Sequence, residues 1–286
     1  MGSLPVFQKI FLFDWFFYIM KKRVFLSVFL LFSFLLSGTS TAFVPQAPHL
    51  LHLVIQKVKR PTGFEAFQTK KFFNNENSEE FYVELEEKLI YLSPKKLRSQ
   101  TLSETTTNFY VESNFEFIKI SDGAVVSRDK LLVEKYTDIL IYRDYETLLT
   151  QLALSGIDTS RVSFQRYDDK ICYAIGGSPE KGKNFPGLWV EKETFLPVKY
   201  VIEKNSQRVE FLYYNWQKSS RTMYPMQVYI YLNDKLFAMV DVKTFDLRSN
   251  FSPALFNINH IESLYPKKKP VNELDNHVKE QQKLYE

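Results

Sequence analysis

The stretch Gly187–Pro225, GLWVEKETFLPVKYVIEKNSQRVEFLYYNWQKSSRTMYP, decides the fold class of this chain. It contains three runs that are apolar throughout or alternate between apolar and polar residues, at 188–190, 198–202 and 209–216. Polar segments of hairpin length separate these runs, as is typical of consecutive antiparallel strands. The stretch therefore predicts an antiparallel meander.

The middle run indicates which face of this meander is apolar. Side chains alternate between the two faces of a strand, so Val198, Tyr200 and Ile202 are expected to point one way. Lys199 and Glu203 are expected to point the other way. One face is then apolar while the other contacts water, and the apolar face needs a cover.

The same alternation, extended to the neighbouring strands, predicts a cavity lined by apolar side chains. The predicted lining residues of the sheet are Val198, Tyr200, Ile202, Phe211, Tyr213, Val228, Ile230, Val240 and Val242. The run 209–216 is ambiguous, because Leu212, Tyr214 and Trp216 make its other face apolar as well. An error of one residue in register would exchange the two faces.

The segment LWVEKETFLPVKY, followed by EFLYYNW and then by MYP, resembles the outer-membrane lipoprotein-sorting proteins, the LolA/LolB-like carriers. The usual sequence motif of these carriers in this region is close to LWxDxxTxLPxR. Here Glu191 takes the place of the aspartate and Lys199 that of the arginine, and both changes keep the charge. The preceding string SGIDTSRVSFQRYDDKICYAIGG strengthens the resemblance, since the family follows a lid-like helix with a similar hairpin.

The resemblance implies a mainly β fold with some helix: an incomplete antiparallel β-barrel, that is, a strongly curved sheet, covered by a few helices. It implies a periplasmic carrier or chaperone that holds acyl chains of lipoproteins or lipids in a hydrophobic cavity, for transfer towards the outer membrane. The implied partners are the acylated lipoprotein or lipid cargo and handover proteins at the inner and outer membranes. We expect a monomer that uses no cofactor.

Two other functions stay open at this point. An envelope sensor or scaffold would use the same fold to bind a protein partner. A hydrolase acting on lipids would need a catalytic group, and the sequence contains no Gly-x-Ser-x-Gly elbow, HExxH, P-loop or paired-cysteine metal motif. We therefore expect that the protein is not an enzyme. His49 and His52 are expected to face solvent, and Cys172 to be a small buried residue.

The N-terminal segment has the features of a secretory signal peptide. Basic residues 21–23 precede the apolar run 24–36, and small residues lie three and one before a cut after Ala42. The apolar run is shorter than the roughly 20 residues that span a bilayer as a helix. We expect residues 1–42 to be cleaved. An uncleaved anchor is the alternative, because the stretch 10–19 is apolar too.

The rest of the chain is expected to form one lipid- or lipoprotein-binding domain, 43–265, followed by a polar tail, 266–286. Thr39 lies where a lipobox would have its cysteine, so no thioether lipid anchor is expected there. Residues before Met20 are interpreted as an over-extended start. The formal net charge of +4 comes mostly from the signal segment, which argues against a nucleic-acid partner.

Periodicity predicts the remaining elements. Helices are expected at 48–60 and 145–154, and the segment 131–142 is ambiguous with strand preferred. Strands are expected at 64–73, 80–93, 95–102, 109–121, 124–127, 162–167, 170–175, 226–232 and 236–245. The second helix carries Leu148, Leu149 and Leu152 on one face and is predicted to act as a lid over the cavity, ending at Gly156. The alternative is a fixed core helix.

Overall fold

The computed structural model describes residues 44–59, 61–73, 81–177 and 185–267. The expected signal peptide, its cleavage site and the tail beyond Lys267 lie outside these residues. Within the described ranges, no helix is long and apolar enough to cross a membrane.

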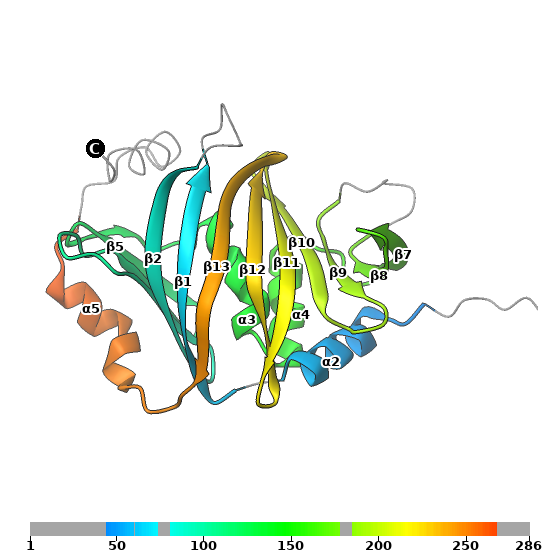
Figure 1. Ribbon diagram of the computed structural model, residues 1–286, viewed down its shortest axis with the longest axis horizontal. Helices are drawn as coiled ribbons and strands as arrows, with labels where there is room; N and C mark the ends of the chain where they lie inside the picture. Colours follow the sequence, from blue (N-terminus) through cyan, green and yellow to red (C-terminus); the bar gives the residue numbers. More distant parts are fainter. Residues whose placement is uncertain (1–43, 60, 74–80, 178–184, 268–286) are drawn as a thin grey trace, which may run out of the picture. The chain divides into compact units, whose positions relative to one another are not determined.

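Within the described ranges, thirteen antiparallel strands form one sheet. Its long central strands lie side by side in Figure 1. The strands are β1 (Gly63–Phe73), β2 (Phe81–Leu92), β3 (Lys96–Thr101), β4 (Phe109–Ser113), β5 (Glu116–Ser121), β6 (Ala124–Ser127), β7 (Val162–Tyr167), β8 (Lys170–Ile175), β9 (Gly187–Glu191), β10 (Pro197–Lys204), β11 (Gln207–Ser219), β12 (Thr222–Leu232) and β13 (Lys235–Leu247). Their spatial order is β6-β5-β4-β3-β2-β1-β13-β12-β11-β10-β9-β8-β7. Two meanders are therefore joined where β1 pairs with β13, and the sheet is open because it ends at β6 and β7.

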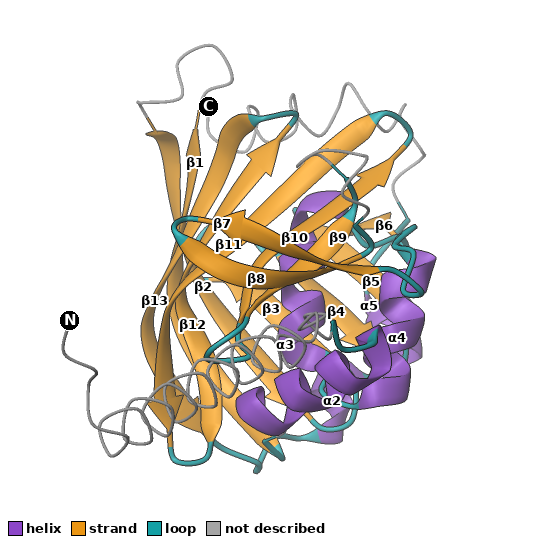
Figure 2. Cartoon of the chain, turned by 90° about the vertical axis from the view of Figure 1, so that its right-hand side faces the viewer, coloured by secondary structure: helices purple, strands orange, loops and turns teal. Residues whose placement is uncertain are grey.

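Helical segments lie on both faces of this sheet. They are α2 (Ala47–Val58), the 3-10 helix η1 (Leu132–Thr137), α3 (Asp138–Ile141), α4 (Tyr145–Leu154), the 3-10 helix η3 (Pro253–Phe256) and α5 (Ile258–Leu264). The sheet curves around α2, α3 and α4, whereas α5 lies outside near β5 (Figure 2). This is the incomplete barrel covered by helices that the sequence predicts.

The inner cluster is the apolar core between the sheet and the segments α2, η1, α3 and α4. Its largest fully buried side chains are Tyr91, Tyr136, Tyr200, Tyr213, Tyr224, Phe64 and Phe211. Aromatic residues bury large areas and keep polar tips that find partners. For example, the Tyr213 hydroxyl donates to the Tyr136 carbonyl at 2.9 Å, which ties β11 to η1.

The prediction that the other face of β10 contacts water is wrong around Lys199. A bulge between Pro197 and Lys199 breaks the alternation, so Val198 leaves the inner cluster. The outer cluster that receives it consists of Cys172, Ala174, Phe185, Trp189, Val198 and Val201. Lys199 is 8 % exposed, and its ammonium pairs with Glu210 at 2.8 Å. The second meander is thus covered by apolar residues on both faces at this point.

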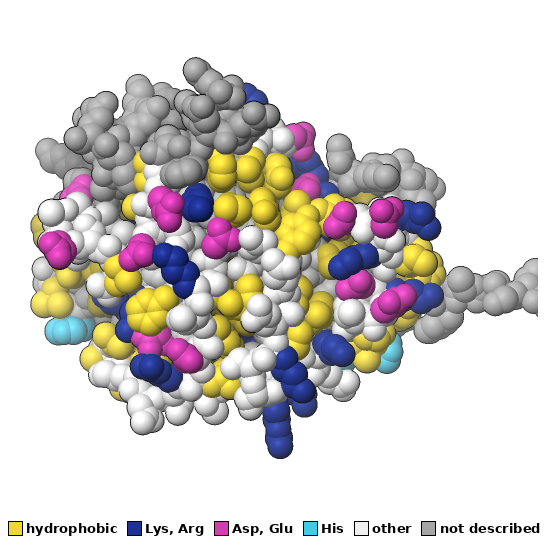
Figure 3. Space-filling view, in the orientation of Figure 1, with side chains coloured by type: hydrophobic (Ala, Val, Ile, Leu, Met, Phe, Trp, Pro, Cys, Tyr) yellow, Lys and Arg dark blue, Asp and Glu magenta, His cyan; other side chains and the backbone are white. Residues whose placement is uncertain are grey.

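On the outer face, η3 and α5 cover a further apolar cluster that includes Ile90, Val111, Ile118 and Ile120, whereas the central strands carry charged side chains there. Basic and acidic side chains lie among hydrophobic ones over the central strands (Figure 3). The cross-strand ion pairs are Lys71 with Glu84, Lys88 with Glu65, Lys243 with Glu86, and Arg248 with Glu65. Opposite charges on neighbouring strands stabilise the pairing of those strands.

Two sequence predictions of secondary structure are wrong. The segment 109–121 is two strands, because Asn114 and Phe115 have positive φ values, 51° and 74°, and form a two-residue hairpin turn. The segment 131–142 is helical rather than a strand, as η1 followed by α3. In addition, the first tail residues return to the sheet, since the Val125 N–H donates to the Pro266 carbonyl at 2.9 Å. That bond covers part of the β6 edge.

Candidate functional site

Eleven of the twelve predicted lining residues come together in or against the inner cluster. Those buried within it are Tyr200, Ile202, Phe211, Tyr213, Val228, Ile230, Val240, Leu148 and Leu152, and those packed against it are Val242 and Leu149. Val198 is the exception, for the reason given above. The alternation read from the strands therefore selects one continuous apolar surface, shared between the sheet and α4.

These side chains are packed against the helices in this structure and do not line an open space. Ile202, for example, is 1 % exposed. The Tyr200 hydroxyl donates to the Ser155 hydroxyl at 3.2 Å, just beyond the end of α4. Burial raises the pKa of Tyr200, so its hydroxyl stays protonated and keeps this bond. A chain of methylene groups would reach this surface only if the helices moved.

The predicted lid helix α4 is short, and both of its ends are capped. Asp144 caps its first turn, where the carboxylate accepts from the Thr147 N–H at 3.0 Å. Gly156, with φ +80°, ends it, and the Ile157 N–H donates back to the Leu152 carbonyl at 3.1 Å. A backbone with positive φ is what glycine tolerates best. Helix α4 is therefore limited to ten residues, nearly three turns.

Helix α2 fixes the position of α4 on its other side. The exposed His52 ring stacks on the Tyr145 ring with centroids 4.3 Å apart. On the opposite face of α2, Leu50, Leu51 and Val54 are fully buried in the inner cluster. Helix α2 is thus the more firmly held of the two.

A hollow of about 380 Å³ opens on the inner face of β1–β5, which we call the rim pocket. It is lined by Lys70, Phe72, Glu84, Leu85, Glu86, Glu87, Ser99, Thr101, Leu102, Ser103, Thr105, Thr106, Asn108, Phe109, Tyr110, Lys119, Ser121 and Glu134. Its volume lies within the range of about 300–1,000 Å³ that is typical of ligand sites. Phe72 belongs to the inner cluster too, so the pocket adjoins the predicted lining surface.

The polar side chains of the rim pocket are mostly paired. Glu87 accepts hydrogen bonds from the Gln68 amide and the Ser99 hydroxyl. The Lys119 ammonium lies 3.5 Å from a Glu134 carboxylate oxygen. The sequence analysis did not identify this pocket. The available signal was Lys70, which shares its strand face with Phe64, Ala66 and Phe72 although it is charged.

A buried ion cluster holds the segment η1–α3 over β4. The Lys130 ammonium lies 2.7 Å from both the Glu112 and the Asp138 carboxylates, and the Tyr142 hydroxyl donates to Glu112. Burial lowers the pKa of Lys130, but the two carboxylates raise it by more, so the net shift is upward. Lys130 is therefore charged at neutral pH, while burial raises the pKa of the Asp138 carboxyl.

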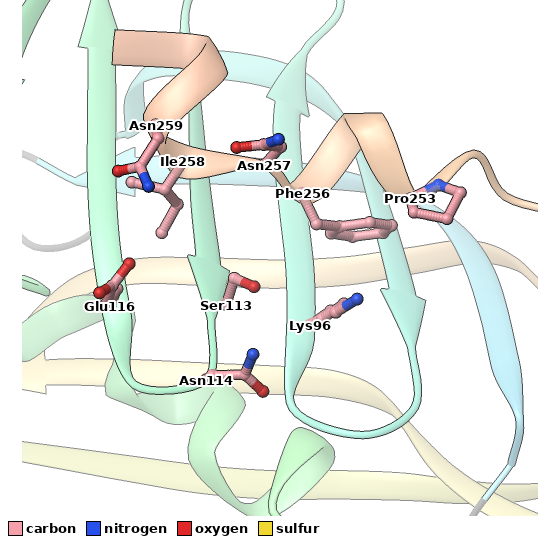
Figure 4. A pocket seen from close by; sticks show the side chains of 9 residues that line it. All are labelled: Lys96, Ser113, Asn114, Glu116, Pro253, Phe256, Asn257, Ile258 and Asn259. Atoms are coloured by element: carbon pink, nitrogen blue, oxygen red, sulfur yellow. The ribbon is translucent and has the colours of Figure 1, made fainter.

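A second hollow, of about 420 Å³, lies on the outer face beneath the C-terminal helices (Figure 4). Phe256 and Ile258 reach over it from η3 and α5, above Lys96, Ser113 and Glu116 of the strands. Asn257 accepts from the His260 N–H at 3.1 Å and is a helix cap. His260 itself is exposed. This hollow shares no residue with the inner cluster.

The remaining candidate groups are one cysteine and two histidines. Cys172 is fully buried, and burial, followed by the nearby Glu191 carboxylate, raises the pKa of its thiol to about 11. His49 and His52 are both exposed. Across the part of the chain that the structure describes, no group of three or more His, Cys, Asp or Glu side chains could hold a metal ion.

The chain is similar to several solved structures. A LolA superfamily protein from Nitrosomonas europaea superposes with a TM-score of 0.52 and 11 % identity, over 76 % of this chain and 100 % of that one. A putative outer membrane lipoprotein-sorting protein domain from Vibrio parahaemolyticus has a TM-score of 0.48 and 8 % identity, over 75 % and 97 %. A DUF1329 family protein from Desulfovibrio piger has a TM-score of 0.48 and 12 % identity, over 76 % and 100 %.

No protein-family model and no curated protein matches the sequence. The fold assignment therefore rests on the superposition with the Nitrosomonas europaea protein, which spans its whole length, and on the open antiparallel sheet with helices on its inner face. At this level of identity the likeness concerns the fold. The chain has the fold of the LolA superfamily.

Proposed function

We propose that this protein is a periplasmic carrier that binds acyl chains of lipoproteins or lipids on the inner face of its sheet. The observation that carries the proposal is the continuous apolar surface shared by β10–β13 and α4, within a LolA-like fold. Burial of each methylene group there would contribute about 0.8 kcal/mol. A chain of a dozen carbons therefore provides enough free energy for tight binding without covalent chemistry.

Binding requires that the helices separate from the sheet, since the surface is packed in this structure. Helix α4 is the proposed moving part, because it is short and only one of its faces is buried. Its Leu154 is 73 % exposed, while Leu148 on the opposite side is buried. Elements with few buried apolar contacts open at the lowest free-energy cost. The cargo would take the place of α4 against the sheet, and the carrier would pass it on when α4 returns.

A charge on the inner side of α4 should reduce lipid retention. Leu149 is partly buried against the inner cluster, so Leu149→Glu would place a carboxylate beside the acyl chain, where it is poorly solvated. We expect the acyl lipid that co-purifies with this variant to fall at least five-fold. Mass spectrometry of organic extracts from the purified protein measures this amount.

The matched control is Leu154→Glu, on the same helix but exposed, which should retain as much lipid as the unchanged protein. Ile202 is a less suitable position, because a charge at a site that is 1 % exposed would unfold the protein. Equal lipid content in Leu149→Glu and Leu154→Glu would contradict the proposed binding surface. A stable complex with a protein and no lipid would favour the sensor or scaffold function instead.

Pinning α4 to α2 should block loading. The double variant His52→Cys/Tyr145→Cys uses two side chains that lie side by side, and α2 is held firmly by the inner cluster. We expect the oxidised form to take up less than a fifth of the acyl lipid that the reduced form takes up. Cys172 should not interfere, because its buried thiol is protonated at neutral pH.

Lipid loading is measured as the uptake of a fluorescent fatty acid by the protein. Reduction of the disulfide should restore this uptake. Each single-cysteine variant, treated in the same way, controls for the substitutions themselves. Equal uptake before and after reduction would show that α4 is a fixed core helix and gates nothing.

A further inference from the structure

We propose that the rim pocket binds the anionic head group of an amphiphile, with the Lys70 ammonium as its counter-ion and the Tyr110 hydroxyl as a donor. This inference deepens the proposed function, on which it rests for the acyl chain. It concerns the opposite end of the ligand, which the apolar surface does not recognise.

Lys70 differs from the other enclosed lysines. Lys130 and Lys199 have carboxylates at 2.7 and 2.8 Å. Lys70 is 7 % exposed, and among the described residues its ammonium has ring contacts but neither an ion pair nor a hydrogen bond. Among the described residues, the Lys70 ammonium lies over two aromatic rings, 5.5 Å from the ring centroid of Tyr136 and 5.6 Å from that of Phe72.

An ammonium with little access to water is stabilised by an anion beside it. The two aromatic rings supply only a part of this stabilisation, through attraction between the cation and the ring faces. The rim pocket is the side from which Lys70 remains accessible. An anion that enters the pocket would therefore supply the counter-ion that the described residues do not provide for Lys70.

Tyr110 supplies a second, independent observation. It lines the same pocket from β4 and is 4 % exposed, and its hydroxyl has no hydrogen-bond partner among the described residues. Burial, and then nearby ionisable groups, raises the pKa of Tyr110, so the hydroxyl is a donor at neutral pH. Buried polar atoms are nearly always bonded, and an orphan that faces a pocket points to a ligand acceptor.

The pocket also limits the charge of its ligand. Four glutamates line it as well: Glu84, Glu86, Glu87 and Glu134. Three of them pair with lysines, Glu84 with Lys71, Glu86 with Lys243 and Glu134 with Lys119, and one Glu134 oxygen has no hydrogen-bond partner within the described ranges. These carboxylates would repel a dianion, so a single negative charge fits best. Both a fatty-acid carboxylate and the phosphodiester of a lysophospholipid have this chemistry.

Apolar side chains show where the rest of the ligand would lie. Phe72, Leu85 and Leu102 line the rim pocket beside the polar groups. Phe72 and Leu85 also pack in or against the inner cluster. An amphiphile with its head group at Lys70 would thus direct its chain towards the apolar surface of the proposed function.

The test compares three amphiphiles of equal chain length by titration calorimetry below their micelle concentrations: dodecanoate, dodecanoyl lysophosphatidylglycerol and neutral monododecanoyl glycerol. We expect the unchanged protein to bind at least one of the two anions ten-fold or more tightly than the neutral compound. The anion that binds more tightly shows whether the pocket prefers a carboxylate or a phosphodiester head group.

Lys70→Met should abolish this preference while the Kd for the neutral compound stays the same. Lys70→Arg should keep the preference, and Tyr110→Phe should weaken binding of the anion about three- to ten-fold. The control is Lys218→Met, an exposed lysine of β11 that does not line the rim pocket. Thermal unfolding of each variant verifies that it is folded.

Equal affinity of the unchanged protein for the anionic and neutral compounds would overturn this inference. It would not contradict the proposed function as a carrier of acyl chains. Retention of the preference in a folded Lys70→Met variant would do the same. If none of the three compounds binds, the inference and the proposed function are both wrong.

Discussion

Replacing Arg143 by methionine should lower the free energy of unfolding by about 3–5 kcal/mol, one of the two largest effects expected for a single change. The Arg143 guanidinium is buried and donates to four backbone carbonyls. They belong to Leu140 at 2.6 Å, Lys59 at 2.7 Å, Val58 at 3.2 Å and Met223 at 3.4 Å. One side chain thus joins the ends of α2 and α3 to β12, and its loss leaves buried carbonyls without donors.

The measurement is chemical denaturation at pH 7 with linear extrapolation. Burial lowers the pKa of Arg143 to about 10, so the side chain is still charged at this pH. The control is Arg161→Met, an exposed arginine paired with Asp158 at 3.0 Å, which should change stability by no more than about 0.5 kcal/mol. Similar losses for the two variants would contradict a special role for Arg143.

Lys130→Met should cost about 3–5 kcal/mol as well, for a different reason. The change leaves the Glu112 and Asp138 carboxylates buried next to each other without their shared cation. The segment η1–α3 is held to β4 by this cluster, so we expect its amide hydrogens to lose protection against exchange before those of the sheet. Denaturation and hydrogen exchange measure the two effects.

The matched control for Lys130 is Lys243→Met, at an exposed pair with Glu86 at 2.9 Å, which should leave the denaturation midpoint nearly unchanged. The triple variant Lys130→Met/Glu112→Gln/Asp138→Asn should recover a large part of the stability, because no unpaired charge remains. If the triple variant were less stable than Lys130→Met alone, uncompensated charge would not be the cause of the loss.

Sequence alone determined the elements whose signal is local. The alternation of Tyr200 and Ile202 with Lys199 and Glu203 is a property of neighbouring residues, and it selects the inner face of β10 at these positions without knowledge of any partner. The run 209–216 is apolar on both faces, so its inner face was decided by the packing of β11 against the helices. The helices α2 and α4 follow from apolar residues at helical spacing, and Gly156 marks the end of α4 correctly. The open curved sheet covered by helices came from the resemblance to the sorting proteins.

Only the tertiary structure decided the features that depend on groups far apart in the chain. Segment 131–142 is apolar enough for a strand, but in the structure it forms η1–α3 and is held to β4 through Lys130, which lies between Asp138 and Glu112. Val198 leaves the inner face because β9 pairs with β10 across a bulge, which no periodicity within β10 reveals.

The rim pocket has the same origin. Lys70 and Tyr110 lie on β1 and β4, and the sheet brings both to one hollow only after β2 and β3 have paired between them. A lysine on an apolar strand face was visible in the sequence, but whether it had a counter-ion was not. Alternation and helical spacing are short-range properties that a sequence displays, whereas ion pairing and enclosure are set by the packing of distant segments.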